Sequence, residues 1–197
     1  MTRRGRSWIV AAVVVAAWLA IARPWTIRPI AAVPSGPFDA RQYVARMWDA
    51  RALPALRSNA VPFDTFRGTR TNRATPVTLH GVILDVDTTS RVGIASIASA
   101  PGGSPDARML IGPVLRGTAL RDSLDFIRFS DFTNQIDFAS VADALNDHVL
   151  ATVLKDVSAA SLKGRQVRVL GVAWRESGAP DALPTVIPVE LSIGDRP

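Results

Sequence analysis

The sequence predicts an α+β fold that is mostly β, in the form of a small barrel of the OB type. The prediction rests on the order of the segments: strand-like runs rich in Val, Ile and Leu come first, one amphipathic helical pattern follows, and two more strand-like runs end the chain. A helical pattern at residues 38–56 and an apolar N-terminal run add a packing helix and a membrane-anchor helix. An open α+β sandwich fits the same order and remains the alternative.

Composition indicates one globular domain and excludes several classes of function. The 197 residues are 48% apolar and 20% charged, which is enough apolar material for a sizeable core. The net charge of +6 is concentrated in residues 1–30, which hold five Arg and no acid; the rest of the chain has 18 basic and 17 acidic residues. We therefore expect no nucleic-acid partner. The absence of Cys excludes disulfides, thiol catalysis and a lipid-modified Cys.

The N-terminus has the pattern of an export segment. Three Arg precede fifteen residues without a charge or a helix breaker, Trp8 to Ala22, and Arg23 follows them. We favour an anchor in the inner membrane, with the body facing the periplasm because the Arg bias keeps the N-terminus inside. A cleaved signal peptide is the alternative, since Ala20 and Ala22 have small-x-small spacing. The expected parts are residues 1–25 (signal anchor or signal peptide), 26–37 (Pro-rich linker) and 38–197 (a single periplasmic OB-like domain).

The helical pattern of residues 38–56 is predicted to pack on the body. Asp39 is its expected N-cap, and Pro54 lies just past its expected end. The apolar stripe of this helix also contains two aromatic residues, and an aromatic ligand platform is the alternative to a core role for them. The stripe comprises Tyr43, Val44, Met47 and Trp48.

Six runs have the composition of β-strands. A loop at residues 101–106 leads from the second run into the third, and an antiparallel meander is the natural topology for the first part of the chain. The fourth run interleaves Phe, Leu and Ile with charges and predicts a strand with an aromatic buried edge. The runs are residues 77–87, 91–98, 108–115, 123–132, 162–176 and 183–195.

An amphipathic helix is predicted from about residue 136 to about residue 157, because apolar residues recur there at i, i+3 and i+4. Asn134 is its expected N-cap, and Asp137 in the first turn is favoured by the helix dipole. Thr133, Asn134 and Gln135 together offer more hydrogen-bonding groups than a cap needs. Capping with loop-locking and contact with a ligand or partner both remain open.

The strongest candidate for ligand chemistry is the loop of residues 111–122. Gly117 frees the backbone, Thr118 is able to cap a short turn, and Arg121 and Asp122 are expected to project outward. Arg116 and Arg121 are then placed to clamp an anionic or polyhydroxyl ligand. The alternative is an Arg–Asp ion pair that pins the loop.

Conventional catalytic and metal-binding sets are missing from the sequence. His80 and His148 lie sixty-eight residues apart and form no metal-binding pair. Asp85 and Asp87 share one strand face, but they precede a turn, where Asp is common for its own hydrogen bonds. We therefore expect no cofactor, no metal and no catalytic residues.

Three stretches resemble the signature of an uncharacterised bacterial family of predicted periplasmic lipoproteins, a domain of unknown function. They are residues 38–56, 87–93 and 111–146, and the likeness extends from Phe38 to about Ile193. The resemblance implies an accessory role beside sugar-type ABC importers. It establishes no catalytic residues, and the chain departs from the family pattern because no lipobox Cys follows the apolar run.

Two functions from different classes follow. The favoured one is a membrane-anchored periplasmic binding module that contacts ABC importer subunits or a solute-binding protein through residues 112–135. The alternative is a periplasmic enzyme acting on a small carbohydrate, with Asp85, Asp87 or Asp122 as acid or base.

Overall fold

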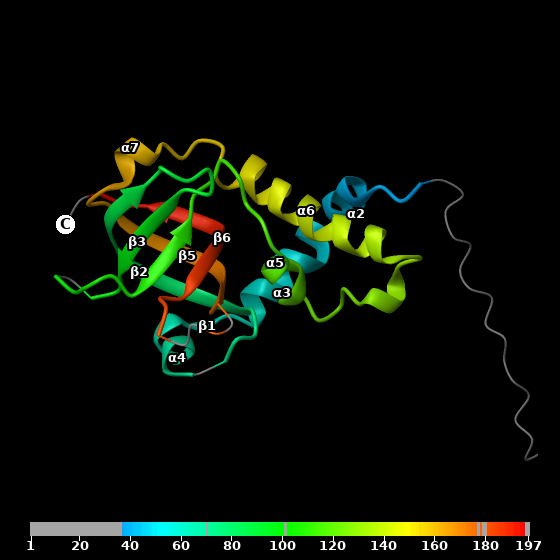
Figure 1. Cartoon of the computed structure of the whole chain (residues 1–197), viewed down its shortest axis with the longest axis horizontal. Helices are drawn as coiled ribbons and strands as arrows, with labels where there is room; N and C mark the ends of the chain where they lie inside the picture. The colour runs from blue at the N-terminus through cyan, green and yellow to red at the C-terminus, as the bar shows by residue number, and fades with distance from the viewer. Residues whose placement is uncertain (1–36, 70, 101, 177, 179–180, 196–197) are drawn as a thin grey trace, which may run out of the picture. The chain divides into compact units, whose positions relative to one another are not determined.

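Five strands close into a barrel in which each strand pairs with two neighbours (Figure 1). The structure is a computed structural model that describes residues 37–195 except 70, 101, 177, 179 and 180. The order around the barrel is β2-β3-β4-β6-β5, and β5 pairs back with β2. Only β4 and β6 run parallel to each other; the other barrel pairs are antiparallel. The strands are β2 (Thr75–Asp87), β3 (Ile94–Ala98), β4 (Ala107–Leu110), β5 (Gln166–Trp174) and β6 (Thr185–Ile193).

Closure of the barrel depends on the long strand β2. Its first half pairs with β5 and its second half with β3, and the change of partner occurs at Gly81 and Val82. A Cβ on Gly81 would lie 2.4 Å from the carbonyl oxygen of Ala98, closer than any side chain tolerates. Glycine therefore permits β2 to cross β3 at the bend that a small barrel requires.

The barrel interior is filled by alternate residues of the strands, as the period of two dictates. The ends of the barrel are closed by two short helices that the sequence patterns did not predict, α4 (Phe63–Gly68) and α7 (Ala159–Leu162). Another short element, β1 (Val61–Pro62), pairs parallel with β2. The core includes Phe63, Phe66, Leu79, Ile83, Ile97, Met109, Leu162, Val167, Val169 and Val186.

A helical layer covers part of the outer face of β5 and β6. Figure 1 shows α2 beside α6, and both contribute to a second core together with Leu170 and Val189 of the barrel. Val44, Met47 and Trp48 are buried in it and Tyr43 is half-buried, which confirms the expected packing stripe. The layer comprises α2 (Ala40–Met47), the π-helix η1 (Trp48–Ala52), α3 (Leu53–Ser58) and α6 (Gln135–Thr152), with α5 (Ala119–Asp122) against it.

Pro54 does not end the first helix, contrary to the prediction. The helix passes through one π-helical segment, η1, in which the N–H of Leu53 bonds to the carbonyl of Trp48, and continues as α3. Pro54 is then near the start of α3, where its missing N–H is tolerated. Asp39 caps the start as predicted, accepting a hydrogen bond from the Gln42 N–H at 3.0 Å.

Residues 123–132 are not a strand. They form a loop with one 3-10 turn, η2 (Phe129–Asp131), and Leu124 and Ile127 enter the core of the helical layer three residues apart. Phe126 lies under the guanidinium of Arg51 at 4.3 Å. The alternation of apolar and charged residues therefore reflects a loop fixed to helices, because all positions around the barrel are taken by other strands.

Two boundaries also differ from the predictions. The strand expected at residues 108–115 ends at Leu110, since Gly112 has a φ of 78°, which is incompatible with a strand. The helix expected to reach residue 157 ends at Thr152, although Val153 and Val157 still pack against the core. The predicted anchor, Trp8 to Ala22, and residues 26–36 of the predicted linker lie outside the described residues. Within the described ranges, no helix has both the length and the apolar character needed to cross a bilayer.

Candidate functional site

The predicted contact residues fall into two groups, one around α5 and one at the N-terminal end of α6. Gly117, with a φ of 96°, turns the chain into α5, and the Thr118 carbonyl accepts the Asp122 N–H at 2.8 Å. The Thr118 side chain does not cap the helix; its hydroxyl donates to an Asp122 carboxylate oxygen at 2.6 Å. Thr118 therefore fixes the rotamer of Asp122.

Arg121 does not project outward as expected. Its side chain is buried, its Nε and one terminal nitrogen donate to Asp122 at 2.9 and 2.7 Å, and its other terminal nitrogen donates to the Phe138 carbonyl at 3.3 Å. The guanidinium also lies 3.8 Å from the centre of the Phe138 ring. Arg121 thus fastens α5 to α6 and has no free donor face for a ligand. This arrangement matches the alternative prediction, an Arg–Asp ion pair that pins the loop. Arg116 is exposed.

A cleft of about 440 Å³ adjoins this turn and contains three of the predicted residues, Gly117, Thr118 and Asp122. Two segments distant in sequence form its other walls, and neither was predicted. Exposed polar groups beside a half-buried aromatic ring, here Trp174, have the chemistry to contact polyhydroxyl compounds through hydrogen bonds and ring stacking. The remaining lining residues are Asn72, Arg73, Ala74, Ala119, Trp174, Arg175 and Glu176.

Ion pairs and backbone contacts hold the two Arg of the cleft. Arg73 pairs with Asp125 at 2.6 Å, and Arg175 donates to the carbonyls of Ala182 and Arg67 at 3.2 and 3.0 Å. Of the two carboxylates that line the cleft, Asp122 accepts hydrogen bonds from Arg121 and Thr118, and Glu176 is exposed.

Asn146 is a residue of this region that the sequence patterns missed, because it looks like one more polar residue of α6. It is 1% exposed, and its Nδ2 donates to the Gly117 carbonyl at 3.0 Å. Its Oδ1 has no hydrogen-bond partner among the described residues. Asn146 thus holds the Gly117 turn against α6.

The second group lies at the start of α6. Asn134 is the N-cap, as predicted: its Oδ1 accepts the Asp137 N–H at 2.8 Å, and its Nδ2 donates to the Asp137 carboxylate at 3.0 Å. Thr133 and Gln135 are exposed, and their side chains make no hydrogen bond with the described residues. The cap accounts for Asn134 and leaves its two neighbours free for contact.

Two exposed large apolar residues lie close to these two in the chain. Phe129 is 56% exposed and Ile136 is 80% exposed, next to a cluster of aromatic rings. We call Phe129, Thr133, Gln135 and Ile136 the tip surface. The rings beneath it are those of Phe38, Tyr43, Phe132 and Phe138, in edge or tilted contact at 5.4 to 5.8 Å.

The other candidate acids and bases are scattered. Asp85 pairs with Lys163 at 2.9 Å, and this hydrogen bond lowers the pKa of the Asp85 carboxyl. Asp87 accepts from the Thr89 hydroxyl and N–H, which lowers its pKa as well. Both are therefore held as carboxylates and are unsuited to donate a proton.

The two histidines lie on different elements. His80 lies on β2, and His148 on α6 stacks on Trp48 at 4.4 Å, where burial lowers its pKa. In the part of the chain that the structure describes, no three His, Cys, Asp or Glu side chains gather closely enough to hold a metal ion.

Comparison with known proteins gives a family and a fold. The sequence model of a family described as "Predicted periplasmic lipoprotein (DUF2291)" matches residues 67–192. A crystal structure of an OB-fold protein from Thermotoga maritima is similar to this chain with a TM-score of 0.57 and 19% identity, covering 80% of this chain and 99% of the other. An OBody bound to hen egg-white lysozyme has a TM-score of 0.35 at 15% identity, over 66% of this chain and 84% of the other. No curated protein matches the chain.

Proposed function

We propose a docking function for this chain, which belongs to the family of predicted periplasmic lipoproteins. It acts as a periplasmic binding module held at the inner membrane by its N-terminal segment. Its partner is a component of a sugar-type ABC importer, either a membrane subunit or the solute-binding protein. The accessory role beside sugar-type ABC importers that the resemblance implies supports this choice of partner. The family description implies a lipid attached to a Cys thiol. This chain contains no Cys, so it offers no thiol for that attachment.

The tip surface is the observation that carries the proposal. Ile136 occupies the first turn of α6 and is exposed, and the exposed Phe129 ring contacts the half-buried Phe138 ring of the same helix at 5.6 Å. Single exposed apolar residues are ordinary, but a group of them at one end of a helix is typical of a protein contact. The free hydrogen-bonding groups of Thr133 and Gln135 supply the polar part of such a contact.

The charges around the tip surface favour a protein over a lipid headgroup layer. Asp131 and Asp137 flank the exposed apolar residues and outnumber the one basic side chain next to Phe129, that of the exposed Arg128; the Asp131 carboxylate accepts the Arg128 backbone N–H. An acidic rim is repelled by an anionic phospholipid surface and attracted by a basic rim on a protein. The partner is therefore expected to offer an apolar pocket bordered by Lys or Arg.

Copurification from native membranes tests the docking function. Tagged full-length protein is expected to retain importer subunits or a solute-binding protein, and a variant with Phe129→Ala and Ile136→Ala is expected to lose them. Arg91→Ala, an exposed change in the β2–β3 turn, serves as the control and is expected to retain them. If the two variants retain the same amount of the partner, and each has an unchanged unfolding midpoint, the tip surface is not the contact.

A second candidate function is an enzyme that acts on a small carbohydrate. The observation that favours it is the α5 cleft, which places the carboxylates of Asp122 and Glu176 in one cavity with Trp174. Asp85 and Asp87 have no part in it, because their hydrogen bonds lie outside the cleft. Turnover of a glycoside panel measured from pH 4 to pH 9, with Asp122→Asn as the inactive control, tests this candidate; no turnover at any pH would reject it.

A further inference from the structure

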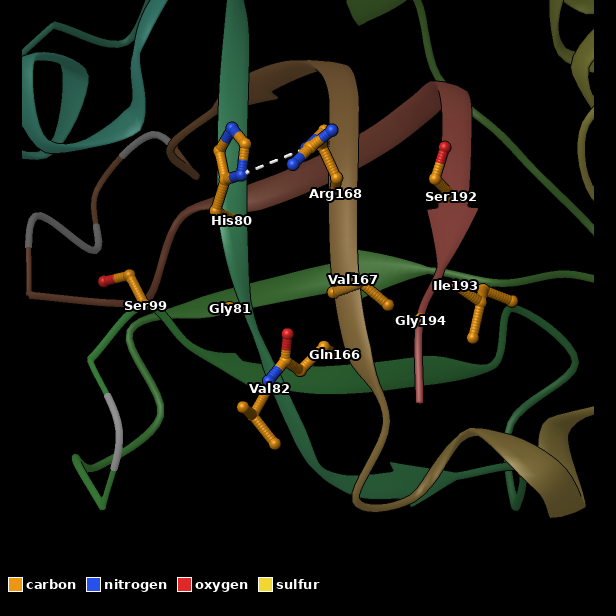
Figure 2. Close-up of a pocket in the computed structure, with 10 residues that line it drawn as sticks. All are labelled: His80, Gly81, Val82, Ser99, Gln166, Val167, Arg168, Ser192, Ile193 and Gly194. Carbon is orange, nitrogen blue, oxygen red and sulfur yellow. Dashed lines mark hydrogen bonds between the residues drawn. The ribbon is translucent and has the colours of Figure 1, made fainter. Parts of the chain in front are cut away.

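We infer that the outer face of β2, β5 and β6 holds a second binding site, which takes a carboxylate group, with Arg168 as its anchor. The site is a groove of about 440 Å³ on the part of the barrel that the helical layer leaves open. Figure 2 shows the His80 ring beside the Arg168 guanidinium, with Ser192 on the next strand.

Strand register creates this site. His80 pairs with Arg168, and Arg168 with Ser192, so the three side chains form one row across three strands. Because side chains alternate along a strand, Leu79 and Val169 next to this row point into the barrel, where they are buried, and the row points outward. On β5, Arg168 of this row is two residues from Leu170, and the helical layer covers Leu170.

Arg168 is held in place by His80. The Arg168 Nε donates to His80 Nδ1 at 3.3 Å, and the two terminal nitrogens of the guanidinium form no hydrogen bond with the described residues. Those nitrogens form the planar pair of donors that matches the two oxygens of a carboxylate. Among the described residues Arg168 forms no ion pair.

Three acids near the groove each have a basic partner among the described residues. Glu190, one step along β6 from Ser192, pairs with Arg57 of α3. Asp106, which accepts hydrogen bonds from Ser99 at the groove wall, pairs with Arg67 at 3.0 Å. The third acid is Asp195, next to Gly194; its carboxylate lies 3.9 Å from the Arg165 guanidinium. The lining residues themselves carry no acid, so the groove has an unmatched positive charge.

The rest of the lining suits a carboxylate that also carries hydroxyl groups. Ser192 and Gln166 present polar side chains, and the glycines at 81 and 194 leave backbone accessible at the floor. The volume is within the range of about 300–1,000 Å³ that small-molecule sites occupy. The carboxylate belongs either to a small hydroxylated acid or to the C-terminus of a peptide, and these sources share the chemistry that Arg168 recognises.

Binding to the full-length protein in a mild detergent tests the site. Gluconate is the small-acid probe and glucose its neutral counterpart; a short peptide with a free C-terminus and its C-terminal amide form the second pair. Calorimetric titration is expected to show binding of one acid and not of its neutral counterpart. Arg168→Gln is expected to weaken that binding about tenfold or more, and Arg91→Gln to leave it unchanged.

The two arms identify the source of the carboxylate. Arg168-dependent binding of gluconate assigns the site to a small acid, and Arg168-dependent binding of the peptide acid alone assigns it to a protein C-terminus. Three results would overturn the inference. They are equal binding of an acid and its neutral counterpart, no binding of either acid, and equal affinity of the wild type and Arg168→Gln. The result is independent of the tip surface, whose residues lie on η2 and α6.

Discussion

At the level of single residues, the polar side chains of the candidate site divide into those that hold the fold and those that are free. The side chains of Asn134, Arg121 and Asn146 all form hydrogen bonds within the chain. Thr133, Gln135 and Arg116 are exposed and form none with the described residues. Residue type alone does not distinguish the two sets, because the partners of the first set come from segments up to twenty-nine positions away.

Asn134→Ala is expected to lower the free energy of unfolding by about 1 kcal/mol, because the Asp137 N–H loses its acceptor at the start of α6. Urea denaturation of the full-length protein measures the change. Thr133→Ala and Gln135→Ala are the matched controls and are expected to shift stability by less than about 0.5 kcal/mol. A Thr133→Ala effect as large as that of Asn134→Ala would contradict the division of roles.

Arg121→Met is expected to destabilise the protein by about 1–2 kcal/mol, since it keeps the apolar stem but removes the Asp122 ion pair and the contacts with Phe138. Arg116→Met, at an exposed position five residues earlier, is expected to have almost no effect. Thermal unfolding of the two variants side by side checks this. If both variants unfold like the wild type, Arg121 does not fasten α5 to α6.

At the level of elements, a sequence pattern predicts the structure correctly where one local property produces the pattern. The strand at 77–87 and the start of the helix after Asn134 are found in the structure because alternation and capping are local properties. The strand predicted at 123–132 fails because its periodicity came from tertiary anchoring of a loop at Leu124 and Ile127. The continuation through Pro54 was hidden because a π-helical segment removes the clash that normally ends a helix.

Gly81→Ala is expected to destabilise the barrel by about 2 kcal/mol or more, because the new Cβ meets the Ala98 carbonyl oxygen where β2 crosses β3. Gly68→Ala at the end of α4 is the control: nothing lies within 4 Å of its Cβ, so we expect a neutral or slightly stabilising change. Denaturant unfolding of both variants gives the comparison. A Gly81→Ala variant as stable as Gly68→Ala would show that the crossing is not constrained by backbone contact.

At the level of the whole molecule, the order of segments was sufficient to predict an OB barrel, because strands, one long helix and two further strands leave few ways to close a small sheet. The site was predicted only in part. Gly117, Thr118 and Asp122 line the α5 cleft, but its other walls at residues 72–74 and 174–176 come together only through the closure of β5 on β2. The row of His80, Arg168 and Ser192 likewise depends on register, which no single segment encodes.

The most direct test of the docking function is photocrosslinking in living cells. A photoreactive amino acid replaces Ile136 on the tip surface in one full-length variant and exposed Arg91 in the other, and mass spectrometry identifies what each captures. The docking function predicts that position 136 captures an importer subunit or a solute-binding protein and that position 91 does not. Capture of phospholipid alone at position 136, or the same set of proteins from both positions, would contradict it.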